Sequence, residues 1–124
     1  MKITAAVLRD PAGPYQLEEV ELAEPTADQV RVRMVGAGMC HTDVIPRAEG
    51  AFVAPPIITG HEGSGIVDAV GSGVTSLAVG DHVVLTFDFC GECSNCTAGR
   101  PAYCDTMLFR NLSGRNLDIG RAHV

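Results

Sequence analysis

The sequence has few aromatic residues and almost no lysine. Phe, Tyr and Trp together make up 5% of the 124 residues, tryptophan is absent, and Lys2 is the only lysine. Nine basic residues stand against fifteen acidic ones, which gives a formal net charge of -6. A chain with this balance has no polybasic face that could follow a phosphate backbone. We therefore expect no nucleic-acid partner.

Long hydrophobic runs are missing as well. The apolar stretch near the N-terminus is interrupted by Arg9, Asp10 and Pro11, so it is too brief for a signal sequence and far below the ~20 residues of a membrane span. We expect no membrane association and a cytoplasmic location. The content of 46% hydrophobic and 19% charged residues is typical of a globular chain. Its length fits one domain over residues 1–124, either complete or a fragment.

Short apolar stretches punctuated by glycine and proline predict a mainly β structure. We expect strands at 2–9, 15–22, 30–35, 66–70 and 82–87. Residues 40–44 could form one helical turn, which Pro46 should end. Residues 105–124 have no clear period, and we assign no element there. Many short strands with frequent turns favour a β barrel or sandwich.

Four of the five cysteines lie within fifteen residues, in a Cys-rich lobe at 90–104, with the spacing Cys-x2-Cys-x2-Cys-x7-Cys: Cys90, Cys93, Cys96 and Cys104. Four thiolates complete a tetrahedral zinc shell and leave no position for water, so the predicted site is structural. Reduced core cysteines or local disulfides are one alternative. An iron–sulfur cluster is another, although the ferredoxin run continues with x3-Cys-Pro instead of the seven-residue gap found here.

A second group of potential zinc ligands consists of the segment 40–43, Cys-His-Thr-Asp, and the segment 60–62, Gly-His-Glu. A thiolate, an imidazole and a carboxylate are all zinc ligands, and the Thr42 hydroxyl lies two residues from Cys40, where it could pass on a proton. The alternative interpretation is a small buried cysteine and a hydrogen-bonded structural histidine.

Taken together, these motifs resemble the N-terminal catalytic domain of zinc-dependent medium-chain alcohol dehydrogenases. The resemblance covers nearly the whole chain and is carried by Gly38-x-Cys40-His41-Thr42-Asp43, Gly60-His61-Glu62-Gly63-x-Gly65-x-Val67, Val79-Gly80-Asp81-His82-Val83 and the cysteine lobe that ends Gly99-x-Pro101-x-Tyr103-Cys104. It implies a GroES-like, partly open β-barrel with a zinc lobe. Residues 101–105 and 111–115 most resemble aryl- or benzyl-alcohol dehydrogenases, which implies oxidation of a primary, possibly aromatic, alcohol with NAD(P).

The resemblance also implies roles for individual residues. Cys40 and His61 would be ligands of a catalytic zinc, and Glu62 would be an alternate ligand. The zinc would act as a Lewis acid toward the alcohol oxygen. The four cysteines of the lobe would hold a structural zinc.

Three neighbours of the ligands would complete the catalytic site. Thr42 would begin the proton relay, and Asp43 would orient the histidine ligand by accepting its other ring N–H. His41 would lie against the pyrophosphate of the nicotinamide cofactor.

The sequence departs from the family pattern in one respect. No Gly-x-Gly-x-x-Gly follows a predicted strand, since Gly63-x-Gly65 and Gly71-x-Gly73 fall in turn regions. Family members continue into a Rossmann domain that supplies the dinucleotide site and the final zinc ligand. We therefore expect the Rossmann domain to be absent and the chain alone to be inactive. We also expect self-association or a partner that supplies the cofactor domain, with a non-catalytic zinc-binding β module as the alternative function.

Overall fold

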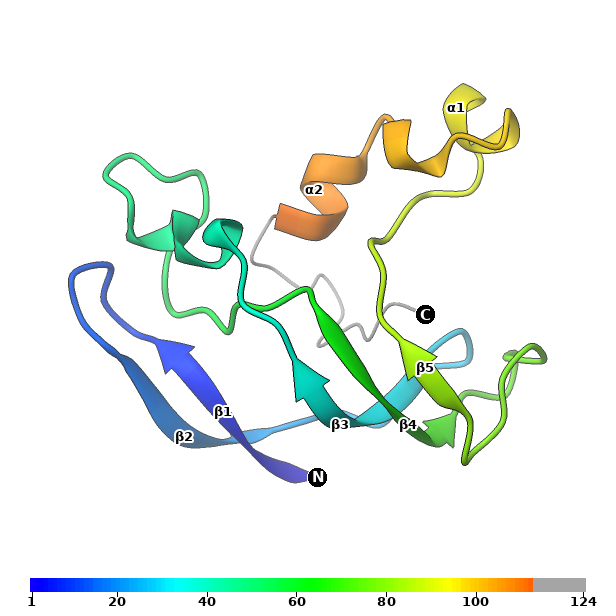
Figure 1. Ribbon diagram of the computed structural model, residues 1–124, viewed down its shortest axis with the longest axis horizontal. Helices are drawn as coiled ribbons and strands as arrows, with labels where there is room; N and C mark the ends of the chain where they lie inside the picture. The colour runs from blue at the N-terminus through cyan, green and yellow to red at the C-terminus, as the bar shows by residue number, and fades with distance from the viewer. Residues whose placement is uncertain (113–124) are drawn as a thin grey trace.

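The computed structural model describes residues 1–112, which form two antiparallel sheets that do not close into a barrel within this range (Figure 1). The first sheet pairs β1 (Lys2–Leu8) with β2 (Tyr15–Glu21). The second has the order β3-β4-β5 and consists of β3 (Val30–Ala37), β4 (Gly63–Val70) and β5 (His82–Val84). The prediction of a mainly β, partly open architecture is confirmed.

The β1–β2 hairpin follows the sequence expectation closely. Its register pairs Lys2 with Glu21 and Leu8 with Tyr15. The turn between the strands closes where the Gly13 N–H donates to the Asp10 carbonyl at 2.9 Å. Aspartate, glycine and proline favour such a turn because they suit its backbone angles.

The strand expected at 82–87 is shorter than predicted, because β5 ends at Val84. Ser64 pairs with Val84, and the Leu85 N–H still donates to the Gly63 carbonyl at 2.8 Å. Beyond this point β4 offers no further partner, because it begins at Gly63. The start of β4, three residues earlier than expected, therefore also fixes the end of β5.

The helical turn predicted at 40–44 is longer than expected. The 3₁₀ helix η1 spans His41–Arg47 and contains Pro46, so the expectation that this proline ends the helix was wrong. Proline has a φ angle suited to helices and lacks only the N–H. A short helix can therefore include it when the carbonyl three residues earlier accepts a hydrogen bond from another donor. That acceptor is the carbonyl of Asp43, and the donor is the hydroxyl of Tyr15 at 2.8 Å.

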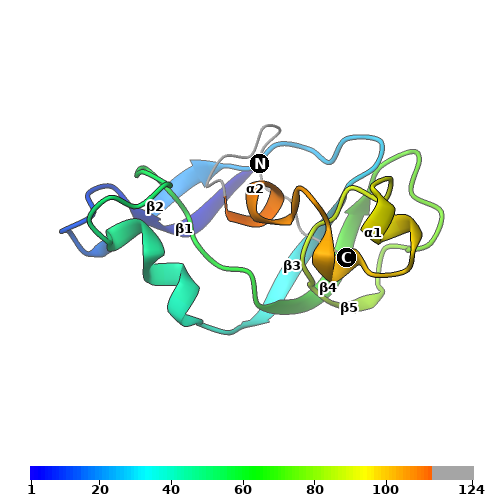
Figure 2. The same cartoon turned by 90° about the horizontal axis from the view of Figure 1, so that it is seen from above.

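The Cys-rich lobe and the last described helix lie above the second sheet, and the lobe is at the end of the molecule far from the β1–β2 hairpin (Figures 1 and 2). The lobe contains α1 (Ser94–Thr97) and η2 (Pro101–Tyr103), and α2 (Met107–Leu112) follows the last cysteine. Helix α2 corrects the sequence analysis, which assigned no element from residue 105 onward. Residues 113–124 of that segment lie outside the described residues. No helix within residues 1–112 is long and apolar enough to cross a bilayer.

A small apolar core joins the hairpin to the segment that precedes His61. It consists of Leu8, Val53 and Ile57, with Tyr15 and Ile45 packed against it. The backbones of Leu8 and Ile57 also exchange two hydrogen bonds, at 2.8 and 3.0 Å. The hairpin is therefore a fixed support for the segment that leads to the second ligand group.

We expect Leu8→Ala to lower the free energy of unfolding by roughly 2–5 kcal/mol, because Leu8 is fully buried and its truncation leaves a cavity in a small core. Leu17→Ala is the matched control, since Leu17 lies on the same hairpin but is 80% exposed. Urea unfolding of both zinc-loaded variants measures the difference. Equal losses of stability in the two variants would contradict this description of the core.

Candidate metal centres and catalytic site

The four cysteines of the lobe converge on one point. Their sulfur atoms all lie within 4.8 Å of one another. The Sγ atoms of Cys90 and Cys96 are 3.9 Å apart, close to the ~3.8 Å that four 2.3 Å Zn–S bonds impose in a tetrahedron. The backbone reaches this arrangement through tight turns at Gly91 and Gly99, whose φ angles are +78° and +75°. The donor set therefore fits a tetrahedral zinc.

Backbone and side-chain donors surround these sulfur atoms. The Cys90 N–H donates to Cys104 Sγ, and the Cys93 N–H donates to Cys90 Sγ, both at 3.3 Å. The Thr106 hydroxyl, 3.4 Å from Cys104 Sγ, is the main reason why the pKa of Cys104 is lowered to about 6. The Asp105 N–H likewise lowers the pKa of Cys93. Desolvation raises the pKa of Cys96 to about 12.

Helix α2 is hydrogen-bonded to Asp88, which lies in the irregular segment between β5 and the lobe. Arg110 Nη1 lies 3.0 Å from Asp88 Oδ2, and the Asn111 side chain bonds the Asp88 N–H and carbonyl at 2.7 and 2.9 Å. The hydrogen bond with Asp88 raises the pKa of Arg110, and the charges of Cys90 and Cys104 raise it further. A guanidinium is thus held near a cluster that becomes strongly negative when four thiolates bind zinc.

The second group of ligands also comes together, although Cys40 is 21 positions from His61 in the sequence. Potential ligand atoms of Cys40, His61 and Glu62 all lie within 4.8 Å of one another. Cys40 precedes η1, and the other two residues precede β4. His61 Nε2 lies 3.8 Å from Glu62 Oε1, so this ring nitrogen faces the cluster.

Asp43 lies behind the ligands and contacts both segments. It is 7% exposed. Its Oδ2 accepts the Cys40 N–H at 2.8 Å, and its Oδ1 lies 3.0 Å from His61 Nδ1. A carboxylate on one imidazole nitrogen directs the other nitrogen toward a metal. This arrangement fits a zinc ligated by the Nε2 atom.

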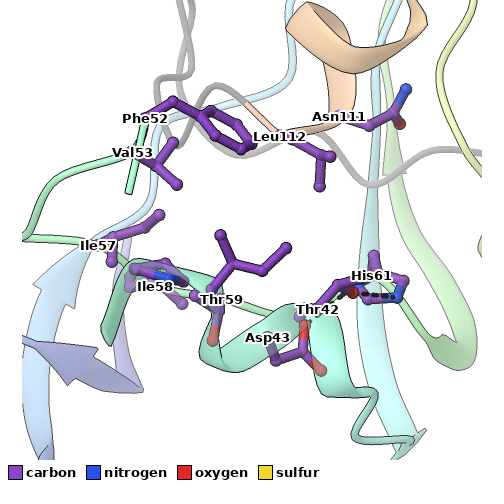
Figure 3. A pocket seen from close by; sticks show the side chains of 13 residues that line it. Thr42, Asp43, Phe52, Val53, Ile57, Ile58, Thr59, His61, Asn111 and Leu112 are labelled. Atoms are coloured by element: carbon purple, nitrogen blue, oxygen red, sulfur yellow. Dashed lines mark hydrogen bonds and ion pairs between the residues drawn. The ribbon is translucent and has the colours of Figure 1, made fainter. Parts of the chain in front are cut away.

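The Thr42 hydroxyl lies between two potential ligands. It donates to Cys40 Sγ at 3.4 Å and is 3.3 Å from His61 Nε2 (Figure 3). The hydrogen bond from Thr42 lowers the pKa of Cys40. Burial lowers the pKa of His61, but its interaction with Cys40 and the charges of Asp43 and Glu62 outweigh burial, so that pKa is raised. The Cys40 thiolate and a protonated His61 thus stabilise each other, and a cation bound by both must displace the His61 proton.

Two further features hold this cluster in place. Gly38 leaves the space that the Glu62 side chain occupies, because a Cβ at residue 38 would overlap the Glu62 carboxylate. The Gly38 N–H also donates to the Glu62 carbonyl at 3.0 Å. His41, the predicted cofactor contact, lies exposed at the first position of η1, beside Cys40.

A hollow of about 90 Å³ opens beside His61 and Thr42 (Figure 3). Most of its lining is apolar and comes from three segments: Ile45 of η1, Phe52, Val53, Ile57 and Ile58 of the following loop, and Leu112 of α2. Sequence analysis did not identify these residues. They carry no local signal, because only the folding of three segments onto one another brings them together.

Comparison with known proteins identifies the family. Residues 26–121 match the model of the alcohol dehydrogenase GroES-like domain. The chain belongs to this family of alcohol dehydrogenase domains. The resemblance stated from the sequence motifs is thereby confirmed.

Individual relatives agree with this assignment. A geraniol dehydrogenase of Castellaniella defragrans is 49% identical over 110 residues, which are 89% of this chain and 29% of that protein. An S-(hydroxymethyl)glutathione dehydrogenase of Candida maltosa is 43% identical over 105 residues, 81% of this chain and 27% of that protein. The crystal structure of benzyl alcohol dehydrogenase from Acinetobacter calcoaceticus is 43% identical, with a TM-score of 0.89 over 98% of this chain and 34% of that one. The chain thus spans about a third of the length of these relatives.

The pKa differences within the lobe predict how zinc binding displaces protons. Near pH 7.5 the Cys104 thiol, with a pKa of about 6, is already ionised, whereas Cys96, at about 12, is protonated. Zinc binds thiolates, so binding should release the proton of Cys96, and zinc affinity should rise with pH. We expect Cys96→Ser to lower the number of protons released per zinc by about one.

Cys104→Ser is the matched control and should leave proton release nearly unchanged. A pH indicator in weak buffer at saturating zinc measures both variants. Equal proton release from the two variants would show that the metal-free lobe does not keep the environments described above.

Proposed function

We propose that this domain forms the zinc-binding, catalytic part of an alcohol dehydrogenase that oxidises a primary alcohol to an aldehyde. The observation that supports this most strongly is the convergence of Cys40, His61 and Glu62, with the Thr42 hydroxyl directly beside two of them. A purely structural site would enclose its metal fully, as the four cysteines can. This cluster borders on a hollow instead.

The ligands, Thr42 and Asp43 have different roles in this proposal. Zinc, when bound by Cys40 and His61 with Glu62 as an alternate ligand, supplies a Lewis acid for the alcohol oxygen. The Thr42 hydroxyl would relay the proton of the alcohol, because Oγ1 accepts that proton while its own hydrogen passes to an acceptor on the solvent side. Asp43 keeps the Nδ1 proton of His61 and so leaves Nε2 free as a ligand.

The hollow supports a substrate with an apolar substituent, either aliphatic or aromatic. Ile57 and Ile58 lie across it from Phe52 and Leu112, while Thr42 and His61 form its polar end (Figure 3). An apolar cavity with a few polar groups at one end binds an amphipathic molecule in one orientation. Benzyl alcohol dehydrogenase and geraniol dehydrogenase among the relatives agree with this class of alcohol.

We further propose that a dinucleotide-binding part must join these residues for turnover, with NAD or NADP as acceptor and His41 near its pyrophosphate. All strand pairs within residues 1–112 are antiparallel, so this range contains no βαβ unit that could bind the cofactor. Exposed apolar side chains of β3, β5 and their flanks could accept that part or a second copy of the chain: Val35, Met39, Val79 and Val84. A cytoplasmic location remains a prediction.

We expect the 124-residue chain to hold one zinc tightly and a second more weakly, because the lobe offers four ligands and the other cluster only three. Cys40→Ser should remove the second zinc and leave the first, whereas Cys96→Ser should weaken the first. Zinc analysis after dialysis at graded free zinc measures both occupancies. A single zinc in wild type at all concentrations would favour the non-catalytic zinc module.

We expect Thr42→Val to lower alcohol oxidation about 10²–10⁴-fold while both zinc ions remain bound, because the change removes the proton acceptor and no ligand. The rate is measured as NADH formation from benzyl alcohol, with the dinucleotide-binding part present. Thr75→Val, at an exposed position between β4 and β5, is the control. An unchanged rate in Thr42→Val would exclude the relay, and turnover by the 124 residues alone would contradict the need for a second part.

A further inference from the structure

We propose that Tyr15 is a positioning residue that holds the Cys40 and His61 segments at the spacing required for a shared metal. The inference rests on the proposed function, because it concerns the affinity of the same metal cluster. Tyr15 is the first residue of β2 and belongs to the hairpin, which contributes no ligand. It nevertheless contacts both segments that do.

The contacts are made by the hydroxyl group. Tyr15 Oη lies 2.8 Å from the Asp43 carbonyl oxygen and 3.0 Å from Thr59 Oγ1. The carbonyl can only accept, so the single hydroxyl hydrogen of Tyr15 goes to Asp43, and the Thr59 hydroxyl donates to Tyr15. One oxygen atom thereby joins η1 to the segment that leads into His61.

The Asp43 carbonyl needs this donor because of the sequence of η1. In a 3₁₀ helix each carbonyl accepts from the N–H three residues later, and here that residue is Pro46, which has none. Since Asp43 is buried, water cannot easily replace the missing donor. The Tyr15 hydroxyl satisfies the carbonyl from another element and fixes the position of η1 in doing so.

The position of the hydroxyl is itself well defined. The Tyr15 ring packs against the core cluster of Leu8, Val53 and Ile57. Leu8 and Ile57 are joined by two backbone hydrogen bonds. The hairpin therefore reaches the 57–61 segment twice, through these backbones and through the Tyr15 hydroxyl.

The effect passes to the metal ligands through Asp43. Its backbone carbonyl is held by Tyr15, while its carboxylate holds the Cys40 N–H and faces His61 Nδ1. Movement of η1 would change both carboxylate contacts at once. Groups that orient ligands in this way typically contribute 10–100-fold to metal affinity.

Cobalt binding tests the inference without reference to turnover. The chain is first loaded with one equivalent of zinc to fill the four-cysteine site and is then titrated with Co²⁺, whose visible absorption reports the geometry of the second site. In Tyr15→Phe the ring remains and only the hydroxyl is lost. We expect cobalt affinity to fall about tenfold and the ligand-field bands to change, while the first zinc stays bound.

Tyr103→Phe is the matched control, because Tyr103 is the other tyrosine of the chain and is 72% exposed. It should leave the titration unchanged. Thr59→Val removes the second partner of the Tyr15 hydroxyl and should weaken cobalt binding less. In the double variant the two losses should not add, since both act through one oxygen.

The outcomes separate the two proposals. Unchanged cobalt affinity and bands in Tyr15→Phe would overturn the inference and leave the proposed function intact. A fall in unfolding stability that weakens both metal sites equally would make Tyr15 a structural residue and also overturn it. A wild-type chain that takes up no cobalt after the first zinc would overturn the proposed function, and the inference with it.

Discussion

The arrangement of the second metal cluster depends on one buried carboxylate, that of Asp43. Burial of a carboxylate is costly unless polar or charged groups lie close to its oxygens. Here one oxygen accepts the N–H of Cys40 and the other faces His61 Nδ1. The backbone of the same residue accepts the Tyr15 hydroxyl. This one residue therefore contacts both segments that carry potential zinc ligands and links the hairpin to the site.

The two metal centres differ in how much of the fold they need. The four cysteines of the lobe lie within fifteen residues, and local turns at Gly91 and Gly99 are sufficient to bring their sulfur atoms together. Cys40 and His61 are 21 positions apart and meet only through tertiary contacts, which the small core around Leu8 supports. The second centre borders on the hollow, and we expect its metal affinity to depend on residues far from its ligands. This difference is consistent with a structural role for the four-cysteine site and with the proposed catalytic role for the Cys40 and His61 site.

Those features of the structure that depend on neighbouring residues could be predicted from the sequence. Alternation of apolar and polar residues predicted β3, short apolar stretches separated by glycine and proline predicted the strands of the hairpin, and cysteine spacing predicted the cluster in the lobe. All three signals lie in neighbouring residues. The end of β5 and the length of η1, which includes Pro46, were not predictable in this way. Each depends on a partner distant in sequence, namely the start of β4 at Gly63 and the Tyr15 hydroxyl that replaces the missing N–H of Pro46. Helix α2 is too short for a periodic signal and is held by contacts with Asp88.

The most direct test of two distinct zinc centres is X-ray absorption at the zinc edge, recorded on the chain with one and with two equivalents of zinc. With one equivalent, four sulfur ligands at ~2.3 Å are expected, because the lobe binds first. With two equivalents the average should fall to about 2.5 sulfur ligands per zinc, with histidine scattering added, because the second centre contributes one cysteine and His61. Four sulfur ligands per zinc at both loadings, or a second zinc that binds without sulfur, would contradict the assignment of Cys40 and His61 to a shared metal.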